Sequence, residues 1–296
     1  MINVKPLVLF LVYLLLNACS HSPSTKASNS STALSKTSLG VITLDEGIDA
    51  SASDPATGDI HTYIVTTPTA TYYLDKQGGG LSSMLDKDGV DWLGFNNRKG
   101  SGWKGEYRGF PNAIHKQDGN YFHAINSSTD ASSSAVSINT DQHVRIEFTS
   151  ANKQWQAQWD FYPDRCDFTM TKISDGYHYW ILYEGVPNGS MDPTDFWYSS
   201  ADTRSHLITD TNTRDLPSPE WIAFGDVDST RMLYLLNHND DSHPDEYVSR
   251  PHMTVFGFGR LNKDKFLDQP KRFSLGFVES TDYSKVENTI KSAVAQ

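Results

Sequence analysis

The chain has 296 residues, of which 36 are acidic and 25 are basic, for a formal net charge of −11. This negative balance disfavours a nucleic-acid partner, because binding to a phosphate backbone requires clustered Lys and Arg side chains. The sequence has no phosphate-binding loop, dinucleotide fingerprint, nucleophile elbow or Cys-based metal motif. Nucleotide chemistry and serine-hydrolase chemistry are therefore unsupported.

Residues 1–18 are expected to form a secretion signal. Lys5 precedes an unbroken apolar run from Leu7 to Leu16, which is long enough for a signal-peptide core and too short to span a bilayer. Residues 16–19, Leu-Asn-Ala-Cys, resemble the lipobox of bacterial lipoproteins. The resemblance implies lipidation of Cys19, and Ser20 in the next position implies sorting to the outer membrane of a Gram-negative cell. The lipid would be the only membrane contact.

Residues 19–40 are predicted to be a flexible tether, and residues 41–296 a single folded domain. Ser, Thr, Ala, Asn and Lys dominate the tether, and such a composition buries too little apolar surface to offset the entropy lost on ordering. With Cys19 lipidated, Cys166 has no partner for an intramolecular disulfide. Because Cys166 lies in a strand-turn-strand pattern, we expect a buried structural thiol.

The folded part is predicted to be all-β with one C-terminal helix. Short stretches rich in β-branched and aromatic residues recur between turn residues. The predicted strands lie within Ile60–Leu74, Leu81–Leu85, Trp92–Phe95, Val136–Ile138, Val144–Thr149, Trp155–Tyr162, Phe168–Ile173, His178–Glu184, Trp221–Phe224, Arg231–His238, Met253–Phe258 and Arg272–Val278. Helical periodicity is convincing only at Tyr283–Ala295, with Val286, Ile290 and Val294 on one face. This pattern predicts a large antiparallel β-sandwich.

Two segments resemble a known family. The Gly-rich stretch from Gly78, the turn Leu81–Gly89 and a Trp strand are similar to the opening of galactose-mutarotase-like supersandwich domains. The closing strand Phe273–Phe277 is similar to how such domains end. The resemblance implies a supersandwich fold of the kind found in polysaccharide lyases, sugar epimerases and accessory modules of glycoside hydrolases. The Asn-His signature of aldose 1-epimerases is missing.

The stretch Gly78–Asn112 carries the first group of candidate site residues. It contains a basic island in an otherwise acidic chain, which suits an anionic ligand such as a uronic acid or a sulfated sugar; a solvated loop is the alternative. The candidate substrate-binding residues here are Arg98, Trp103, Lys104 and Asn112. Trp103, between Gly and Lys, is the tryptophan that we expect to be exposed for stacking on a sugar ring.

Lyase chemistry on a uronic acid needs a cation to neutralise the carboxylate and a group to take the proton from the adjacent carbon. Arg108 suits the first task, and Tyr107 or His123 the second. Because alternate residues of a strand face opposite sides, Glu106 and Arg108 can share a face, whereas Tyr107 and Arg108 cannot. The alternative is a loop held by a Glu106–Arg108 pair.

The segment 238–252 carries the second group. His243 is a candidate proton acceptor, and Tyr247 and Arg250 are candidate substrate contacts. Asp240, Asp241 and Asp245 offer oxygen ligands for Ca²⁺, although without EF-hand spacing. An ordinary acidic surface loop is the alternative.

Glu184 belongs to a third group, with Trp180, Tyr183, Asn188 and Asp192. Glu184 is the last residue of a predicted strand, where it would act as an acid or base. With Glu106 it would make a glycosidase carboxylate pair if the two converge. For Trp180 and Tyr183, packing in the core is the default expectation.

Together these features predict an envelope-anchored protein that acts on an acidic polysaccharide or oligosaccharide. The preferred hypothesis is a β-eliminating polysaccharide lyase. A non-catalytic glycan-binding lipoprotein and a glycoside hydrolase with Glu106 and Glu184 remain as alternatives. No cofactor is required by the sequence, and Ca²⁺ is the candidate ion.

Overall fold

The computed structural model describes residues 40–54, 58–94, 108–124 and 131–296, and residues 39–296 form one compact unit. The described elements, in chain order, are β1 (Thr43–Asp54), β2 (Gly58–Thr66), β3 (Ala70–Asp75), β4 (Leu81–Asp86), β5 (Ser133–Thr140), β6 (His143–Thr149), β7 (Trp155–Phe161), β8 (Arg165–Ile173), β9 (Ile181–Gly185), η2 (Pro187–Gly189), β10 (Asp195–Ser199), β11 (Asp202–Leu207), β12 (Glu220–Asp226), β13 (Met232–Asn237), β14 (Glu246–Arg250), β15 (Met253–Phe258), β16 (Arg260–Leu261), β17 (Asp264–Lys265), β18 (Arg272–Val278) and α1 (Tyr283–Val294). Among these residues no helix has the length and apolar character needed to cross a membrane.

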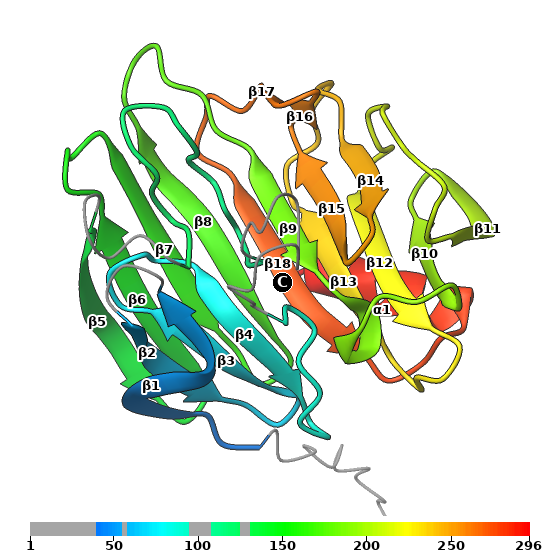
Figure 1. Ribbon diagram of the computed structural model, residues 1–296, viewed down its shortest axis with the longest axis horizontal. Coiled ribbons are helices and arrows are strands. Elements are labelled where there is room, and N and C mark those ends of the chain that lie inside the picture. The colour runs from blue at the N-terminus through cyan, green and yellow to red at the C-terminus, as the bar shows by residue number, and fades with distance from the viewer. Residues whose placement is uncertain (1–39, 55–57, 95–107, 125–130) are drawn as a thin grey trace, which may run out of the picture. The chain divides into compact units, whose positions relative to one another are not determined.

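A nine-stranded antiparallel sheet forms one layer of a β-sandwich, in the order β11-β10-β12-β13-β18-β8-β7-β6-β5. Two smaller antiparallel sheets, β1-β2-β3-β4 and β14-β15-β9, lie over the two halves of this layer (Figure 1). The prediction of a large antiparallel β-sandwich with one C-terminal helix is therefore confirmed.

The chain around Phe110 joins the two smaller sheets. Leu81 of β4 donates its backbone N–H to the Phe110 carbonyl at 2.7 Å. On the other side, Gly109 and Glu184 of β9 exchange backbone hydrogen bonds of 2.8 and 3.0 Å. The end of the stretch Gly78–Asn112 therefore continues the hydrogen bonding from one small sheet to the other.

Aromatic side chains fill the space between the layers. Trp159 is fully buried, and its ring centroid lies 5.2 Å from that of Phe168 and 5.8 Å from those of Phe110 and Phe161. Its indole Nε1 donates to the Gly79 carbonyl at 3.0 Å, so the polar end of the ring is satisfied inside the core. Cys166 is also fully buried and free, as predicted, and burial raises the pKa of its thiol.

Helix α1 packs on the outer face of the nine-stranded sheet. Asp282 caps the helix by accepting a hydrogen bond from the Lys285 backbone N–H at 3.1 Å. Val286, Ile290 and Ala293 are buried in a cluster with residues of β12 and β13. The prediction that Val294 lies on the buried face is wrong: its exposed fraction is 38%, because Ala293 takes the contact with the sheet.

Other strand predictions differ from the structure. The described part of Trp92–Phe95 is not a strand. The pairing with β4 continues through the bridge between Leu85 and Asp91 and through backbone hydrogen bonds from Asp86 to Val90 and from Trp92 to Met84. Strands β1, β10, β11 and β14 were not predicted. Their sequences carry several polar residues, so the β-propensity signal is weak, and pairing with neighbouring strands decides their conformation.

Replacing Leu235 in the centre of β13 tests the core directly. Leu235 is 1% exposed, so Leu235→Ala should lower the free energy of unfolding by about 2–5 kcal/mol through lost burial and the cavity left behind. The matched control is Leu207→Ala, at a leucine that is 64% exposed, which should change stability by less than about 0.5 kcal/mol. Urea unfolding measures both, and equal losses would contradict the placement of the core.

Candidate functional site

Strand β9 places one set of side chains in the core and another on the outward face of the three-stranded sheet. Ile181 and Tyr183 belong to the main core, where the Tyr183 ring stacks on Phe224 with centroids 5.5 Å apart. Because successive side chains of a strand alternate, Leu182 and Glu184 face away from the nine-stranded sheet. Trp180, just before β9, joins Leu182 in a separate apolar cluster on that face. We call this surface the β9 face.

Arg260 lies across the β9 face in a place that Gly257 leaves open. Gly257 stands opposite Glu246 of β14 and Leu182 of β9. A Cβ on Gly257 would meet the Arg260 Cδ at 2.6 Å. The missing side chain therefore lets the arginine fold back over β15, where its guanidinium pairs with the Glu246 carboxylate.

Trp180 holds two cations against its ring. The Arg260 guanidinium carbon lies 5.3 Å from the ring centroid and the Lys265 Nζ lies 4.3 Å from it, which is within cation–π range. Lys265 Nζ also donates to the His115 carbonyl at 2.8 Å. Burial lowers the pKa of both Arg260 and Lys265, because each cationic group has lost part of its hydration.

Glu184 forms a buried hydrogen bond with Asn112. Asn112 Nδ2 donates to Glu184 Oε2 at 2.7 Å, and the exposed fractions of the two residues are 1% and 8%. Asn112 has a left-handed φ of 41°, a conformation that Asn tolerates better than most residues. Its backbone carbonyl accepts from the Trp180 indole at 2.7 Å. Asn112 thus connects the carboxylate to the cation-bearing ring.

The buried polar atoms on this face that have no hydrogen-bond partner among the described residues include two of opposite hydrogen-bonding character. They are Oδ1 of Asn112, an acceptor, and Nε of Arg260, a donor. Buried polar atoms are usually satisfied, so exceptions indicate an absent ligand or water, or a functional role. A sugar hydroxyl could donate to the first atom and a carboxylate could accept from the second.

Arg108 flanks this arrangement and is engaged with backbone. Its guanidinium donates to the carbonyl of Gly94 and, at 2.8 Å, to that of His252. Burial lowers the pKa of Arg108, and the nearby Asp91 carboxylate opposes that shift. Arg108 therefore ties the loop after β14 to the chain after β4, which limits its freedom to follow a substrate.

The structure gathers part of the predicted site. Arg108, Asn112 and Glu184 are linked through the segment 108–112, and Arg250 lies on β14 in register with Met253 of the apolar cluster. The other predictions from this stretch lie outside the described residues, and so does the lipidation site: Arg98, Trp103, Lys104, Glu106, Tyr107 and Cys19. For these the structure gives no placement.

Three predicted residues lie elsewhere. Tyr247 is fully buried in the core, where its hydroxyl donates to the Ile208 carbonyl at 2.7 Å, so the structure removes it from substrate contact. His243 makes its described contacts with Asp241 and with the ring of Phe266. His123 pairs with Gly79 beside β4, and burial lowers its pKa to about 3. Neither histidine has a described contact with Glu184.

The predicted Ca²⁺ ligands separate. Asp245 is buried and accepts backbone hydrogen bonds from Leu216 and Gly259, at 3.0 and 3.1 Å, which is a structural role. Asp240 is exposed. Asp241 lies within 4.8 Å of Asp215 and Glu220, but its carboxylate is paired with the Lys271 ammonium at 2.9 Å.

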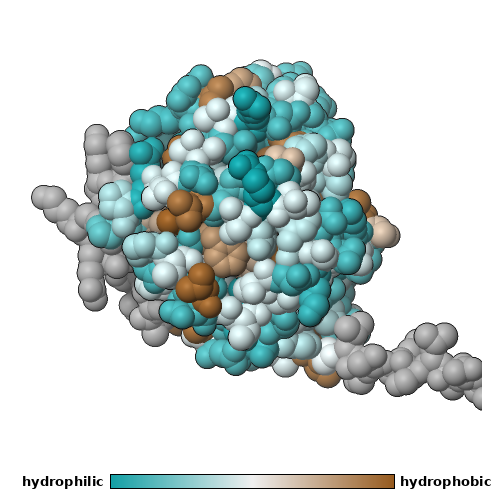
Figure 2. Space-filling model, turned by 90° about the vertical axis from the view of Figure 1, so that its right-hand side faces the viewer, coloured by the Kyte–Doolittle hydropathy of each residue, from teal (hydrophilic) through white to brown (hydrophobic). Residues whose placement is uncertain are grey.

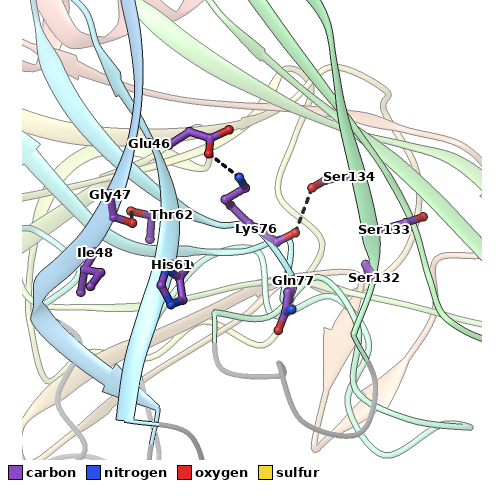
Figure 3. A pocket seen from close by; sticks show the side chains of 10 residues that line it. All are labelled: Glu46, Gly47, Ile48, His61, Thr62, Lys76, Gln77, Ser132, Ser133 and Ser134. Atoms are coloured by element: carbon purple, nitrogen blue, oxygen red, sulfur yellow. Dashed lines mark hydrogen bonds and ion pairs between the residues drawn. The ribbon is translucent and has the colours of Figure 1, made fainter.

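An open groove lies between β1, β2 and β5 (Figure 3), and its lining residues do not belong to the β9 face. Its volume is about 760 Å³, and its lining includes Glu46, His61, Lys76 and Ser134. Lys76 spans the groove by pairing with Glu46 at 2.6 Å, and its backbone carbonyl accepts from Ser134 at 3.0 Å. Because Lys76 and Glu46 pair with each other, the groove is less suited to bind a charged ligand than the β9 face is.

The side of the molecule that lies on the right in Figure 1 has a mainly hydrophilic surface. Figure 2 shows apolar side chains there in separate spots among polar ones. Single exposed apolar residues are normal for a soluble surface. The described residues on this side therefore do not suggest a broad apolar docking surface.

Arg260, Lys265 and Glu246 were not predicted. Arg260 and Lys265 come from the short hairpin β16–β17 and Glu246 from β14, which are far from Glu184 in sequence. The one local signal was Gly257 inside an apolar strand, since glycine in a strand interior often marks a close approach by another group.

Of the three comparisons with known proteins, the one with solved structures gives matches. No family model matches the chain, and no curated protein matches it. Among solved structures, the chain is similar to HI1317, with a TM-score of 0.51 and 14% identity over 80% of this chain and 99% of that one. At this identity the likeness shows the fold alone.

Other similar structures include proteins described as mutarotases. A galactose mutarotase-related enzyme from Lactobacillus acidophilus aligns with a TM-score of 0.45 and 8% identity, over 75% of this chain and 99% of that one. The candidate mutarotase YeaD from Salmonella typhimurium aligns with a TM-score of 0.45 and 12% identity, over 74% and 90%. A bacterial glucoamylase complexed with acarbose aligns with a TM-score of 0.43 and 9% identity, over 86% of this chain and 38% of that one.

The buried Glu220 predicts a pH effect on stability. Burial is the main cause that raises its pKa to about 7, above the value of about 4.3 expected in the unfolded chain. Between those values the folded state binds more protons, so this group lowers stability as pH rises from about 4.5 to 7. Glu220→Gln should flatten that part of the profile of urea midpoint against pH. The control Asp240→Asn, at an exposed carboxylate, should leave the slope unchanged; an unchanged slope in Glu220→Gln would contradict the assignment.

Proposed function

We propose that this chain is a carbohydrate-active protein that binds an acidic saccharide on the β9 face and cleaves it, most simply by β-elimination. The observation that carries the proposal is the buried Glu184–Asn112 pair beside two cations held on Trp180. A face with a carboxylate and two partly buried cations suits a ligand that carries hydroxyl groups and a negative charge.

The arrangement suits the steps of an elimination. Arg260, with its unsatisfied Nε, would neutralise the uronate carboxylate and so acidify the C–H bond on the adjacent carbon. Glu184 would take that proton, the electron pair would form the C=C bond, and the C–O bond to the leaving sugar would break. Lys265, whose pKa burial lowers, would give a proton to the leaving oxygen.

Arg108 fits a supporting role better than the neutralising role predicted from sequence. Both of its terminal nitrogens donate to backbone carbonyls, whereas the Arg260 guanidinium lies on the Trp180 ring of the β9 face. In the proposal, Arg108 fixes the chain that carries Gly109 and Asn112, and Arg260 meets the substrate.

Two alternatives use the same face. A glycoside hydrolase would need a second carboxylate opposite Glu184; Glu106 lies outside the described residues, and Glu246 is engaged by Arg260. A glycan-binding protein would use the cations without turnover. The experiment below separates the three by product: unsaturated ends, new reducing ends, or neither.

Glu184→Gln tests the catalytic assignment. The amide keeps the shape and can still accept from Asn112, but it cannot take a proton, so activity should fall by about 100-fold or more. Purified protein is incubated with a panel of acidic polysaccharides, and absorbance of the unsaturated uronate is followed. Gel retardation on the same panel measures binding, which the variant should retain.

The matched control is Glu220→Gln, because Glu220 is likewise buried and accepts from the side chain of Asn237 but lies outside the β9 face. It should keep its activity. Arg260→Gln should lose both turnover and retardation by acidic polysaccharide, while retardation by neutral polysaccharide stays as in the wild type. Retardation without unsaturated or reducing ends in the wild type would overturn the enzymatic proposal and leave the binding protein.

The envelope location is also part of the proposal. The apolar run before Cys19 and the likeness to a lipobox support it. In a bacterial host, metabolic labelling with a clickable fatty acid should mark the wild type, and Cys19→Ala should abolish the label. Labelling that persists in Cys19→Ala would contradict lipidation at this residue.

A further inference from the structure

Three carboxylates converge where the chain leaves β9 and enters β10. Asp192, Asp195 and Asp226 each offer an oxygen atom, and these atoms lie within 4.8 Å of one another. Asp195 at the start of β10 stands directly opposite Asp226 at the end of β12, so both side chains project from the same face of the sheet. Asp192 approaches from the loop between η2 and β10.

Asp195 contributes an observation of its own. The residue is 1% exposed, and only its Oδ2 is partnered, by the Asp192 backbone N–H at 2.8 Å. Its Oδ1 is buried and accepts no hydrogen bond. An unsatisfied buried carboxylate oxygen is costly, and a like charge directly opposite on the neighbouring strand adds to the cost. Such an atom needs a cation or a proton.

The groups that the described residues offer to these carboxylates are neutral. Asp226 accepts from Asn188 Nδ2 at 2.9 Å, from Thr194 Oγ1 at 3.0 Å and from the Asp228 backbone N–H at 3.1 Å. Among the described residues, no Lys, Arg or His forms an ion pair with any of the three aspartates. These hydrogen bonds orient the carboxylates without neutralising them.

We propose that Asp192, Asp195 and Asp226 bind a calcium ion. The donors are all hard oxygen atoms, which Ca²⁺ prefers, and its bonds of about 2.3–2.6 Å can bridge oxygens up to roughly 5 Å apart. The ion occupies the space that Asp195 Oδ1 borders, and water and nearby carbonyls complete its coordination. Asn188 and Thr194 hold Asp226 in the orientation that the ion needs.

The ion would connect the catalytic strand to the large sheet. From Glu184 the chain runs through Gly185 and η2 to Asp192, and Asp226 belongs to β12 of the nine-stranded sheet. Calcium therefore fixes the segment that follows Glu184. The site does not depend on the proposed activity, because its ligands are separate from the β9 face.

The competing occupant is a proton. Burial, with the charges of Asp192 and Asp226, raises the pKa of Asp195 to about 7. A protonated Asp195 would need no cation, and calcium would then have no effect. The second acidic group, Asp215, Glu220 and Asp241, provides a control, since Lys271 already pairs with Asp241.

Calcium titration of the full chain, purified in detergent and stripped with a chelator, tests the proposal. Isothermal titration should give one site with Kd of about 10⁻⁵ to 10⁻³ M, and excess CaCl₂ should raise the melting temperature relative to chelator. Asp195→Asn should weaken binding by at least about tenfold, since one charge is removed with little change of shape. Asp241→Asn, in the other acidic group, should bind as the wild type does.

A second measurement does not depend on a variant of the ligands. Tb³⁺ bound at the site should luminesce on tryptophan excitation, because Trp197 lies two residues from Asp195 on β10. Added Ca²⁺ should quench the signal by displacement, and Trp197→Phe should reduce it. Absence of calcium binding by the wild type would overturn the proposal. Binding lost in Asp241→Asn but kept in Asp195→Asn would overturn it as well, as would Tb³⁺ luminescence unchanged in Trp197→Phe.

Discussion

The two-sided packing of β9 is the constraint on which the candidate site depends. Its inward residues, Ile181 and Tyr183, are buried against the nine-stranded sheet, which fixes the strand and its register with β15. Strand alternation then forces Leu182 and Glu184 to the outward face. The position of Glu184 therefore follows from core packing, and the large apolar area behind it makes that position rigid.

Gly257 and Asn112 convert this rigid face into a polar site. At Gly257 the missing side chain admits Arg260 over β15, and at Asn112 a left-handed backbone brings an amide to Glu184. Trp180 then contacts Arg260 and Lys265 through cation–π interactions, and Arg260 also pairs with Glu246. The face consequently keeps partly buried charge of both signs, which is the condition under which ionisable groups have perturbed pKa values and can do acid–base chemistry.

Much of the fold could be predicted from sequence, and less of the site. Alternating apolar residues identified strands such as β6 and β18, and a continuous apolar run identified β13, because these patterns reflect the core directly. Polar strands such as β14 and β11 lacked that pattern and form only through pairing. Glu184 was a candidate because it ends a predicted strand, and Asn112 because it closes the Gly-rich stretch Gly78–Asn112. Arg260 and Lys265 could not be found, because their place depends on the hairpin β16–β17 folding over β15, a long-range contact. Tyr247 was misassigned for the same reason: nothing local tells on which face of β14 it lies.

The most direct test of the account is a crystal structure of Glu184→Gln protein with an acidic oligosaccharide. The account predicts a uronate carboxylate within hydrogen-bond distance of Arg260 Nε, and a sugar hydroxyl or the acidic C–H bond facing position 184. The Asn112 Oδ1 atom should accept a hydrogen bond from the ligand. An oligosaccharide bound elsewhere, for example in the groove between β1, β2 and β5, with Arg260 Nε still unpartnered, would contradict the account.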